Sequence, residues 1–376
     1  MRLLHLATIA FLIAAPAQAA VVGHMTPAPP LTPERLVEMP ATERGAWTTY
    51  LARSKAAGKL NTATPTPGPP PVSGKAAASM PLDRPAAWYA SPEARHVADV
   101  IVSFQTPAGG WGKNSPRTAV RQPGQPFSAE KAYVGTIDND ATATELRFLA
   151  RVIAAGGGSP YRGSFDRGVR WLLAAQYPNG GWPQVWPLVG GYHDAVTFND
   201  DAMVAAVALL GDVAAGRGDY AFVQPALRQD AAAAWRRGLA CLLAAQAPQG
   251  GWPQQADTLT LAPAGARNFE PAALASAESA QILAYLMSLP DPSPHVVRAV
   301  HAGAAWLQAT ALPDGTWVRF RDLTSGRPVF GDRDRTIHDD VADLSPERQR
   351  GYAWYGTGPA KALARYEAWA RVHPQP

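Results

Sequence analysis

Residues 174–184 read AAQYPNGGWPQ and residues 244–254 read AAQAPQGGWPQ, so the chain contains nearly the same loop twice. In both copies an apolar helical pattern ends at Gln, a turn with two glycines follows, and Trp comes next. Looser copies occur at 105–111 (QTPAGGW) and 311–317 (ALPDGTW). The four tryptophans, at positions 111, 182, 252 and 317, are therefore 71, 70 and 65 residues apart.

This spacing predicts the fold class. Each interval has room for two helical segments, and a two-helix unit buries its apolar faces only by stacking against its neighbours. We therefore expect a mainly α-helical fold, a toroid of helical hairpins similar to an (α/α) barrel, with long irregular loops and little β-structure. This domain would span residues 93–376, and the period would place the loops that follow Trp on one face of the ring.

The chain before this domain divides into two parts. Residues 1–19 have the pattern of a secretory signal peptide, because Arg2 precedes the apolar run LLHLATIAFLIAA and Ala17-Gln18-Ala19 fits a cleavage site. The run is shorter than the ~20 residues of a membrane span. We expect a secreted or periplasmic protein with no membrane span after cleavage. Residues 20–92 form an N-terminal extension with short helices and a Pro-rich linker or strap.

Composition limits the partners. Lys and Arg total 34 against 30 for Asp and Glu, a mild excess that permits an anionic partner without requiring one. No basic run or nucleic-acid motif occurs, so we expect no nucleic-acid partner. Cys241 is the single cysteine, which excludes an intrachain disulfide, and its apolar surroundings predict a buried, inert thiol. Nothing predicts a large apolar interface, so we expect a monomer.

Polar clusters precede the second helix of three units, in TIDND, TFNDD and ARNFE. The period brings Asp138, Asp140, Asp200, Asp201 and Arg267 to one face. A helix cap uses one side-chain oxygen, and further adjacent carboxylates repel each other unless a cation lies among them. Oxygen ligands without nearby His or Cys suit Ca²⁺ or Mg²⁺ rather than zinc.

Several longer motifs resemble one enzyme family. SFQTPAGGWGKN, YVGTIDNDATATELRFLARV, ARNFE, RPVFGDRD and GYAWYGTGPAKAL are similar to the pectate lyases of polysaccharide lyase family 10. The resemblance runs from about residue 93 to 366. It implies an exported enzyme that cleaves polygalacturonate by calcium-assisted β-elimination and leaves 4,5-unsaturated oligogalacturonides.

The resemblance also implies roles for particular residues. Asp138 and Asp200 would bind Ca²⁺, with Asp138 also acting in catalysis, and Arg267 would be the base. Lys113 is the alternative base, because burial lowers the pKa of a lysine more readily than that of an arginine. The residues expected to contact the substrate are Trp111, Asn114, Asn199, Arg319, Arg327 and Tyr355.

Two other functions remain open on the residues alone. A glycoside hydrolase built on an (α/α) toroid would use two carboxylates as acid and base on a uronic-acid polysaccharide. A non-catalytic protein would bind polyuronate and release no product. An arginine base would favour an alkaline optimum, because a guanidinium loses its proton only at high pH, its pKa being above ~12.

Overall fold

The computed structural model describes residues 20–375, and the expected signal peptide lies outside these residues. The helices are α1 (Pro33–Leu36), α2 (Ala41–Thr62), α3 (Pro92–Ser103), α4 (Ala143–Ala154), α5 (Ser159–Ala175), α6 (Ala202–Ala215), α7 (Pro225–Ala244), α8 (Ser276–Leu286), α9 (Pro294–Ala309), α10 (Pro346–Arg350) and α11 (Gly358–Val372). The strands are short: β1 (Val21–His24), β2 (Val196–Thr197), β3 (Gln255–Ala256), β4 (Leu274–Ala275), β5 (Trp317–Val318), β6 (Phe320–Arg321), β7 (Phe330–Gly331), β8 (Thr336–His338) and β9 (Tyr355–Gly356).

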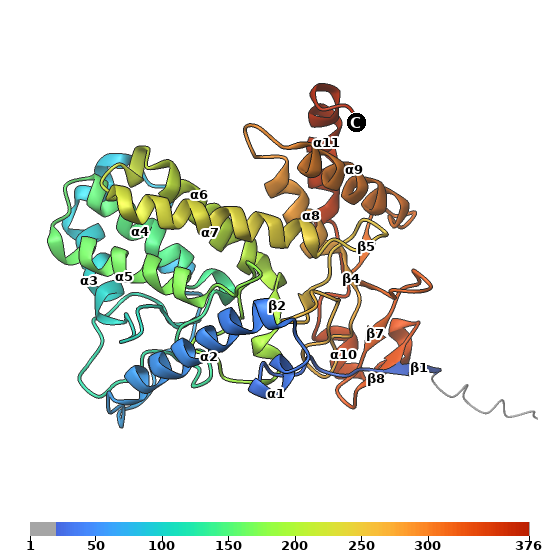
Figure 1. The fold of residues 1–376 in the computed structure, drawn as a ribbon, viewed down its shortest axis with the longest axis horizontal. Helices are drawn as coiled ribbons and strands as arrows, with labels where there is room; N and C mark the ends of the chain where they lie inside the picture. The colour runs from blue at the N-terminus through green and yellow to red at the C-terminus, as the bar shows by residue number, and fades with distance from the viewer. Residues whose placement is uncertain (1–19, 376) are drawn as a thin grey trace, which may run out of the picture.

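The main helices form two layers. Helices α3, α5, α7 and α9, the outer helices, pack side by side in one layer. Helices α4, α6, α8 and α11, the inner helices, form the other layer. Consecutive helices of the hairpins α4–α5, α6–α7 and α8–α9 also pack on each other. In Figure 1, α3 and α11 lie at opposite ends of the molecule, so the described layers form an open arc and not a closed barrel. The predicted helical toroid with little β-structure is confirmed in this open form.

Each repeated Trp is anchored in the same way. Its indole N–H donates to the backbone carbonyl ten residues earlier, at the end of the preceding helix, and the indole is buried. The four bonds are Trp111 to Ile101 (2.7 Å), Trp182 to Leu172 (2.9 Å), Trp252 to Leu242 (2.7 Å) and Trp317 to Leu307 (2.7 Å). The GGW loop therefore folds back on its own helix.

Neighbouring units are joined through the Gln that begins each loop. The Gln176 amide donates to Gly180 O within its own loop and to Ala234 O in α7 of the next unit. Gln105 makes the same pair of bonds with Gly109 and Ser164, and Gln246 makes it with Gly250 and Ala299. The loop thus fixes the distance between consecutive outer helices.

Glycines in the outer helices leave room for the indoles. A Cβ on Gly168 of α5 would come within 2.7 Å of the Trp111 ring, and one on Gly238 of α7 would lie 3.0 Å from Trp182. Gly303 of α9 stands in the same relation to Trp252, at 2.8 Å. Because such distances are too short for a carbon contact, each indole requires a glycine in the next unit.

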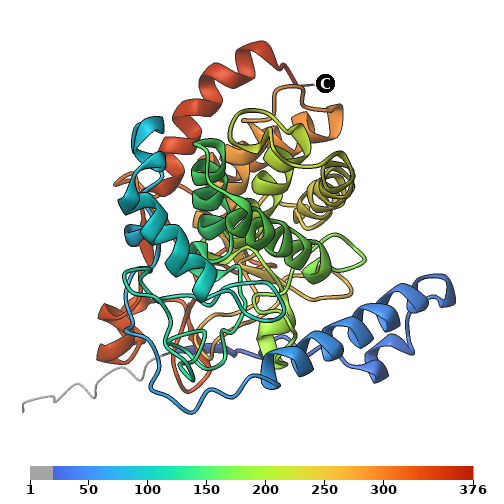
Figure 2. The same ribbon diagram turned by 90° about the vertical axis from the view of Figure 1, so that its left-hand side faces the viewer.

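The N-terminal extension lies on the main domain as a strap. Trp47 and Tyr50 of α2 are buried against Tyr177, with ring centroids 5.3 and 4.7 Å from it, and Tyr50 donates to Ala175 O. Figures 1 and 2 show α2 below the helical layers in both views. At 22 residues, α2 is longer than the short helices that we expected. It continues through Gly45 and Gly58 because its buried side chains pack on the domain.

The beginning of the strap also reaches the loops after α5 and α7. Strand β1 pairs with β8 in a sheet of order β1–β8–β7. Farther along, Ala28 N–H donates to Gly265 O (2.7 Å) and Leu31 N–H donates to Asp194 Oδ2 (3.0 Å). Arg35 forms an ion pair with Asp257 at 2.6 Å. The first residues of the strap therefore hold two loops that flank the site described below.

Two expectations drawn from composition concern single features. Cys241 is buried in α7, and burial raises the pKa of its thiol to about 12, which leaves it uncharged and unreactive. Within residues 20–375, every helix is too short or too polar to cross a bilayer.

Candidate functional site

The residue two positions after each repeated Trp reaches one common site. Lys113, Gln184 and Gln254 line a single pocket. The fourth, Arg319, lies beside it and donates to Gln254 Oε1 at 3.3 Å. The backbone is held alike in the first three units, since the Trp carbonyl accepts from the segment that precedes the next inner helix: Thr136 N–H to Trp111 O, Thr197 N–H to Trp182 O and Ala275 N–H to Trp252 O. The repeat therefore delivers one polar side chain per unit to the site.

The polar clusters before α4 and α6 form two matching turns, Asp138–Asp140 and Asn199–Asp201, which pack against each other. Each has two successive residues in the left-handed region: Asn139 (φ 50°), Asp140 (φ 61°), Asp200 (φ 50°) and Asp201 (φ 62°). Asn and Asp tolerate this conformation best, and such strain is typical of functional sites. The two turns bring the side chains of Asp138, Asn139, Asn199 and Asp200 into the pocket.

Asp138 is a buried carboxylate of the pocket, with 3% of its surface exposed. Its Oδ2 accepts from Lys113 Nζ at 2.6 Å, whereas its Oδ1 is buried without a hydrogen-bond partner in the described structure. Burial, and then Asp200 and Asp138, raise the pKa of Asp140. Burial and the carboxylates of Asp140 and Asp200 raise the pKa of Asp201 to about 6. This corner therefore has an excess of negative charge and an unused oxygen.

Lys113 lies on the same side of the pocket as Asp138. Its ammonium lies 3.6 Å from the centre of the Tyr133 ring and 3.8 Å from Glu130, in addition to its bond with Asp138. Asn114 lies outside the lining and joins the surrounding loops, since it donates to Glu130 Oε1 (2.6 Å) and accepts from Asn139 Nδ2 (3.1 Å).

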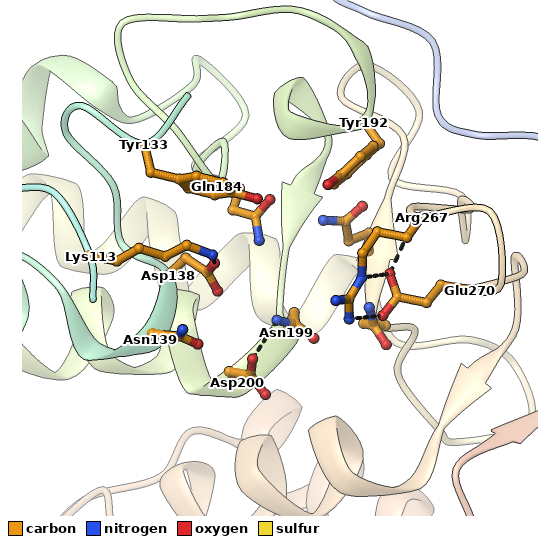
Figure 3. A pocket seen from close by; sticks show the side chains of 12 residues that line it. Lys113, Tyr133, Asp138, Asn139, Gln184, Tyr192, Asn199, Asp200, Arg267 and Glu270 are labelled. Carbon is orange, nitrogen blue, oxygen red and sulfur yellow. Dashed lines mark hydrogen bonds and ion pairs between the residues drawn. The ribbon is translucent and has the colours of Figure 1, made fainter. Parts of the chain in front are cut away.

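Arg267 faces this group from the other side of the pocket, as Figure 3 shows. Its Nε donates to Glu270 Oε2 at 2.9 Å, and its Nη2 donates to Oε1 at 2.5 Å. Burial alone would lower the pKa of Arg267, but the hydrogen bonds and charge of Glu270 raise it above the usual value. Burial likewise opposes ionisation of Glu270, but Arg267 and the Tyr352 hydroxyl hold the pKa of this carboxyl below its usual value.

Arg319 forms the floor beside the pocket. Its Nη2 donates to the buried Glu278 at 3.0 Å and to Asn199 Oδ1 at 3.4 Å. Asn199 Nδ2 in turn donates to Asp200 Oδ2 at 2.7 Å. These bonds connect the buried Glu278 to Asp200 and fix the orientation of the Asn199 amide. Arg319 therefore holds these two pocket residues in place.

Three of the expected substrate-contacting side chains lie elsewhere. Trp111 has no exposed surface, because its indole is anchored to Ile101 O and packs on Gly168, so the expectation that it contacts substrate is wrong. The Arg327 side chain is 69% exposed and pairs with Asp339. Tyr355 is 45% exposed and lines a separate hollow with Val341 and Arg350. Neither Arg327 nor Tyr355 lines the pocket of Asp138 and Arg267.

The sequence interpretation did not single out several pocket residues. Tyr133 and Tyr192 lie in long loops, for which no periodic signal exists. Gln184 and Gln254 had such a signal, since each follows its Trp by two positions as Lys113 does. The whole lining consists of Lys113, Tyr133, Asp138, Asn139, Gln184, Tyr192, Asn199, Asp200, Gln254, Gln255, Arg267 and Glu270.

Comparison with known proteins identifies the family of this chain. The sequence model of the pectic acid lyase family matches residues 105–316 and 310–363. A family 10 polysaccharide lyase from Cellvibrio cellulosa is 31% identical in a structural alignment that covers 80% of this chain and 98% of that chain, with a TM-score of 0.66. The chain belongs to polysaccharide lyase family 10.

A second family 10 structure from Cellvibrio cellulosa is an aspartate-to-alanine mutant in complex with trigalacturonic acid. It is 30% identical, covers 79% of this chain and 98% of that chain, and has the same TM-score of 0.66. Among curated proteins, none matches the chain. Membership of family 10 confirms the resemblance in the motifs and makes the chain a polysaccharide lyase, which sets aside the hydrolase and the non-catalytic binding protein.

Proposed function

We propose that this family 10 lyase cleaves polygalacturonate by calcium-assisted β-elimination and releases 4,5-unsaturated oligogalacturonides. The observation that carries the proposal is the single pocket in which Asp138 and Asp200 face Arg267. The family 10 mutant structure bound to trigalacturonic acid supports a galacturonate polymer as substrate. The sequence supports an exported monomer, secreted or periplasmic, with an anionic polysaccharide as its partner.

The pocket fits a calcium ion whose coordination shell is completed by the substrate. In residues 20–375, no group of three His, Cys, Asp or Glu side chains forms a metal site by itself. Asp138 Oδ1 is nevertheless buried and unpartnered, and Asp200 lines the same corner. Because Ca²⁺ takes six to eight oxygen ligands, Asp138 and Asp200 would hold it together with the uronate carboxylate and water. The bound ion would withdraw charge from that carboxylate and so make the neighbouring C–H more acidic.

The basic side chains of the pocket, Arg267 and Lys113, then act on the sugar. Arg267 removes the proton from C5, the C–H electron pair forms the C4=C5 bond, and the C4–O4 bond breaks. The released O4 takes a proton from solvent. Lys113, held by Asp138, is suited to binding a uronate carboxylate. Glu270 fixes the plane of the Arg267 guanidinium and raises its pKa. The reactive neutral form of Arg267 therefore becomes abundant only at alkaline pH.

Incubation with polygalacturonate, with and without Ca²⁺ and with EDTA, tests this function. We expect ultraviolet absorbance of the unsaturated product to rise with Ca²⁺ and to stop with EDTA. New reducing ends without absorbance, or binding without cleavage, would contradict the proposal.

A further inference from the structure

Gln184 differs from the other residues at its repeat position. Its side chain is 94% buried at the pocket, since 6% of its surface is exposed. Its Oε1 is buried without a partner, and no bond from its Nε2 to another described residue exists. The three equivalent side chains are paired: Lys113 with Asp138, Gln254 with Arg319, and Arg319 with Glu278.

The backbone of Gln184 is, by contrast, fully used. Its N–H donates to His193 O at 3.0 Å, and its carbonyl accepts from Thr136 Oγ1 and from Ile137 N–H. The backbone from which the side chain extends is therefore fixed by two neighbouring loops. A buried amide oxygen without a partner costs about 1–3 kcal/mol, so the unpaired Gln184 amide at the pocket is suited to a ligand that supplies the missing bonds.

Aromatic rings lie beside Gln184 in the pocket. Tyr133 and Tyr192 flank it at the pocket, and both pack on the His193 ring, with centroids 5.2 and 4.2 Å away. Burial lowers the pKa of His193, which keeps that ring uncharged at neutral pH. In Figure 3 Gln184 lies across the pocket from Asp200. The pocket thus has an acidic end at Asp200, and Gln184 lies across from that end beside Tyr133.

We propose that the Gln184 amide binds the adjacent hydroxyls O2 and O3 of the galacturonate residue in this pocket and so selects sugars that are not acylated there. The inference rests on the proposed function. With the C6 carboxylate on the Asp200 side of the pocket, the opposite edge of the six-membered ring, C2–C3, faces Gln184. An amide offers one acceptor and two donors, which matches two neighbouring hydroxyls. An O-acetyl group removes the hydroxyl donor and adds bulk against a fixed wall.

The amide oxygen could instead be a calcium ligand, because Ca²⁺ also accepts amide oxygens. The two roles predict different results. A calcium ligand would change the Ca²⁺ concentration needed for half-maximal activity, whereas a hydroxyl-binding amide would leave it unchanged and alter the preference between substrates.

The experiment compares the full mature chain with Gln184→Met, which keeps the bulk of the side chain, and Gln184→Ala, which removes it. Gln122→Met, in an exposed loop, is the matched control. The substrates are polygalacturonate and the same polymer chemically acetylated at O2 and O3. Calorimetric binding of trigalacturonate and of its acetylated form provides a second readout that does not depend on turnover.

We expect both Gln184 variants to lose about 10- to 100-fold in kcat/KM on polygalacturonate, the effect of one or two hydrogen bonds. In Gln184→Ala the ratio of acetylated to plain substrate should rise at least ~10-fold, and Gln122→Met should match the wild type. Unchanged binding of plain trigalacturonate, an unchanged ratio, or a shifted Ca²⁺ requirement would overturn the proposal. If the wild type binds trigalacturonate but releases no unsaturated product, the proposed function fails, while the binding comparison still tests Gln184.

Discussion

The guanidinium of Arg267 forms a two-pronged ion pair with the carboxylate of Glu270, with Nε–Oε2 and Nη2–Oε1 distances of 2.9 and 2.5 Å. Bidentate pairs of this kind are among the strongest charge-assisted hydrogen bonds in proteins. The pair has two opposite effects on a proton acceptor: it fixes the direction of the guanidinium, and it stabilises the protonated form. The pH dependence of the enzyme therefore reports the role of Arg267.

Glu270→Gln should move the activity profile to lower pH. Activity requires neutral Arg267, so a pKa raised by Glu270 places the rising part of the profile at alkaline pH. Without that charge the pKa falls, and we expect a displacement of about one pH unit or more, together with a lower maximal kcat because orientation is lost. The measurement is kcat against pH from the absorbance of the product.

Glu130→Gln is the matched control, because Glu130 lies 3.8 Å from Lys113 and not beside Arg267. Its profile should keep the wild-type pH dependence. A displacement in Glu130→Gln with none in Glu270→Gln would identify Lys113 as the base instead.

Asp138→Asn and Asp200→Asn should each raise the Ca²⁺ concentration needed for half-maximal activity by about tenfold or more. Each change removes one charged oxygen ligand from the proposed site, and charge count sets calcium affinity. Calcium titration of activity, with binding followed by calorimetry, measures the effect. Asp219→Asn, on an exposed loop away from the pocket, should titrate as the wild type does; equal Ca²⁺ requirements in all four proteins would exclude both ligands.

Glu278→Gln should destabilise the fold as well as the site. Glu278 and the Arg319 side chain are 1% and 14% exposed, and breaking a buried pair by removing one partner costs about 3–5 kcal/mol. Urea unfolding gives the free energy of unfolding directly. The more exposed pair of Arg147 and Asp212, with side chains 29% and 47% exposed, supplies the comparison, and Asp212→Asn should change stability by less than about 1 kcal/mol. A similar small effect of Glu278→Gln would show that Arg319 does not depend on this carboxylate.

Two glycine substitutions in α5 should change the free energy of unfolding in opposite directions. Gly168→Ala places a Cβ 2.7 Å from both Leu146 and Trp111, and such overpacking costs about 1–3 kcal/mol. At Gly163 the nearest atom is the flexible end of Arg167 at 3.6 Å, so Gly163→Ala should stabilise the helix by about 0.5–1 kcal/mol. Chemical denaturation of both variants checks the pair, and a stabilising Gly168→Ala would refute the anchoring of Trp111 on that glycine.

The period of the tryptophans was sufficient to predict the helical layers, because the same anchor occurs in every unit. It also brought Asp138, Asp200, Lys113 and Arg267 together, since equivalent loops of stacked units share a face. The direction of a side chain was not predictable in this way. Trp111 was expected in the groove from the polar residues after it, but its indole bonds back to the helix before it.

Other parts of the site depend on loops without a repeat. Tyr133 and Tyr192 reach the pocket through the long segments before α4 and before β2, whose paths are set by tertiary contacts. The bond from Arg319 to Glu278 joins residues 41 positions apart, and no local pattern indicates it. Arg327 was placed by resemblance and Tyr355 because an aromatic ring can stack on a sugar, and the C-terminal loops carry both away from Asp138 and Arg267.

The pairing of β1 with β8 has a consequence for the order of folding. Residues 21–24 find their partners only at 336–338, and the same segment of the strap bonds to Gly265, two residues before Arg267. A chain that emerges N-terminus first must keep this edge unpaired until nearly all of it has been made, and such long-range contacts form slowly. The helical units can stack as they are synthesised. The loop that carries Arg267, however, is supported by the N-terminal strap, which is the first part of the described chain to be made.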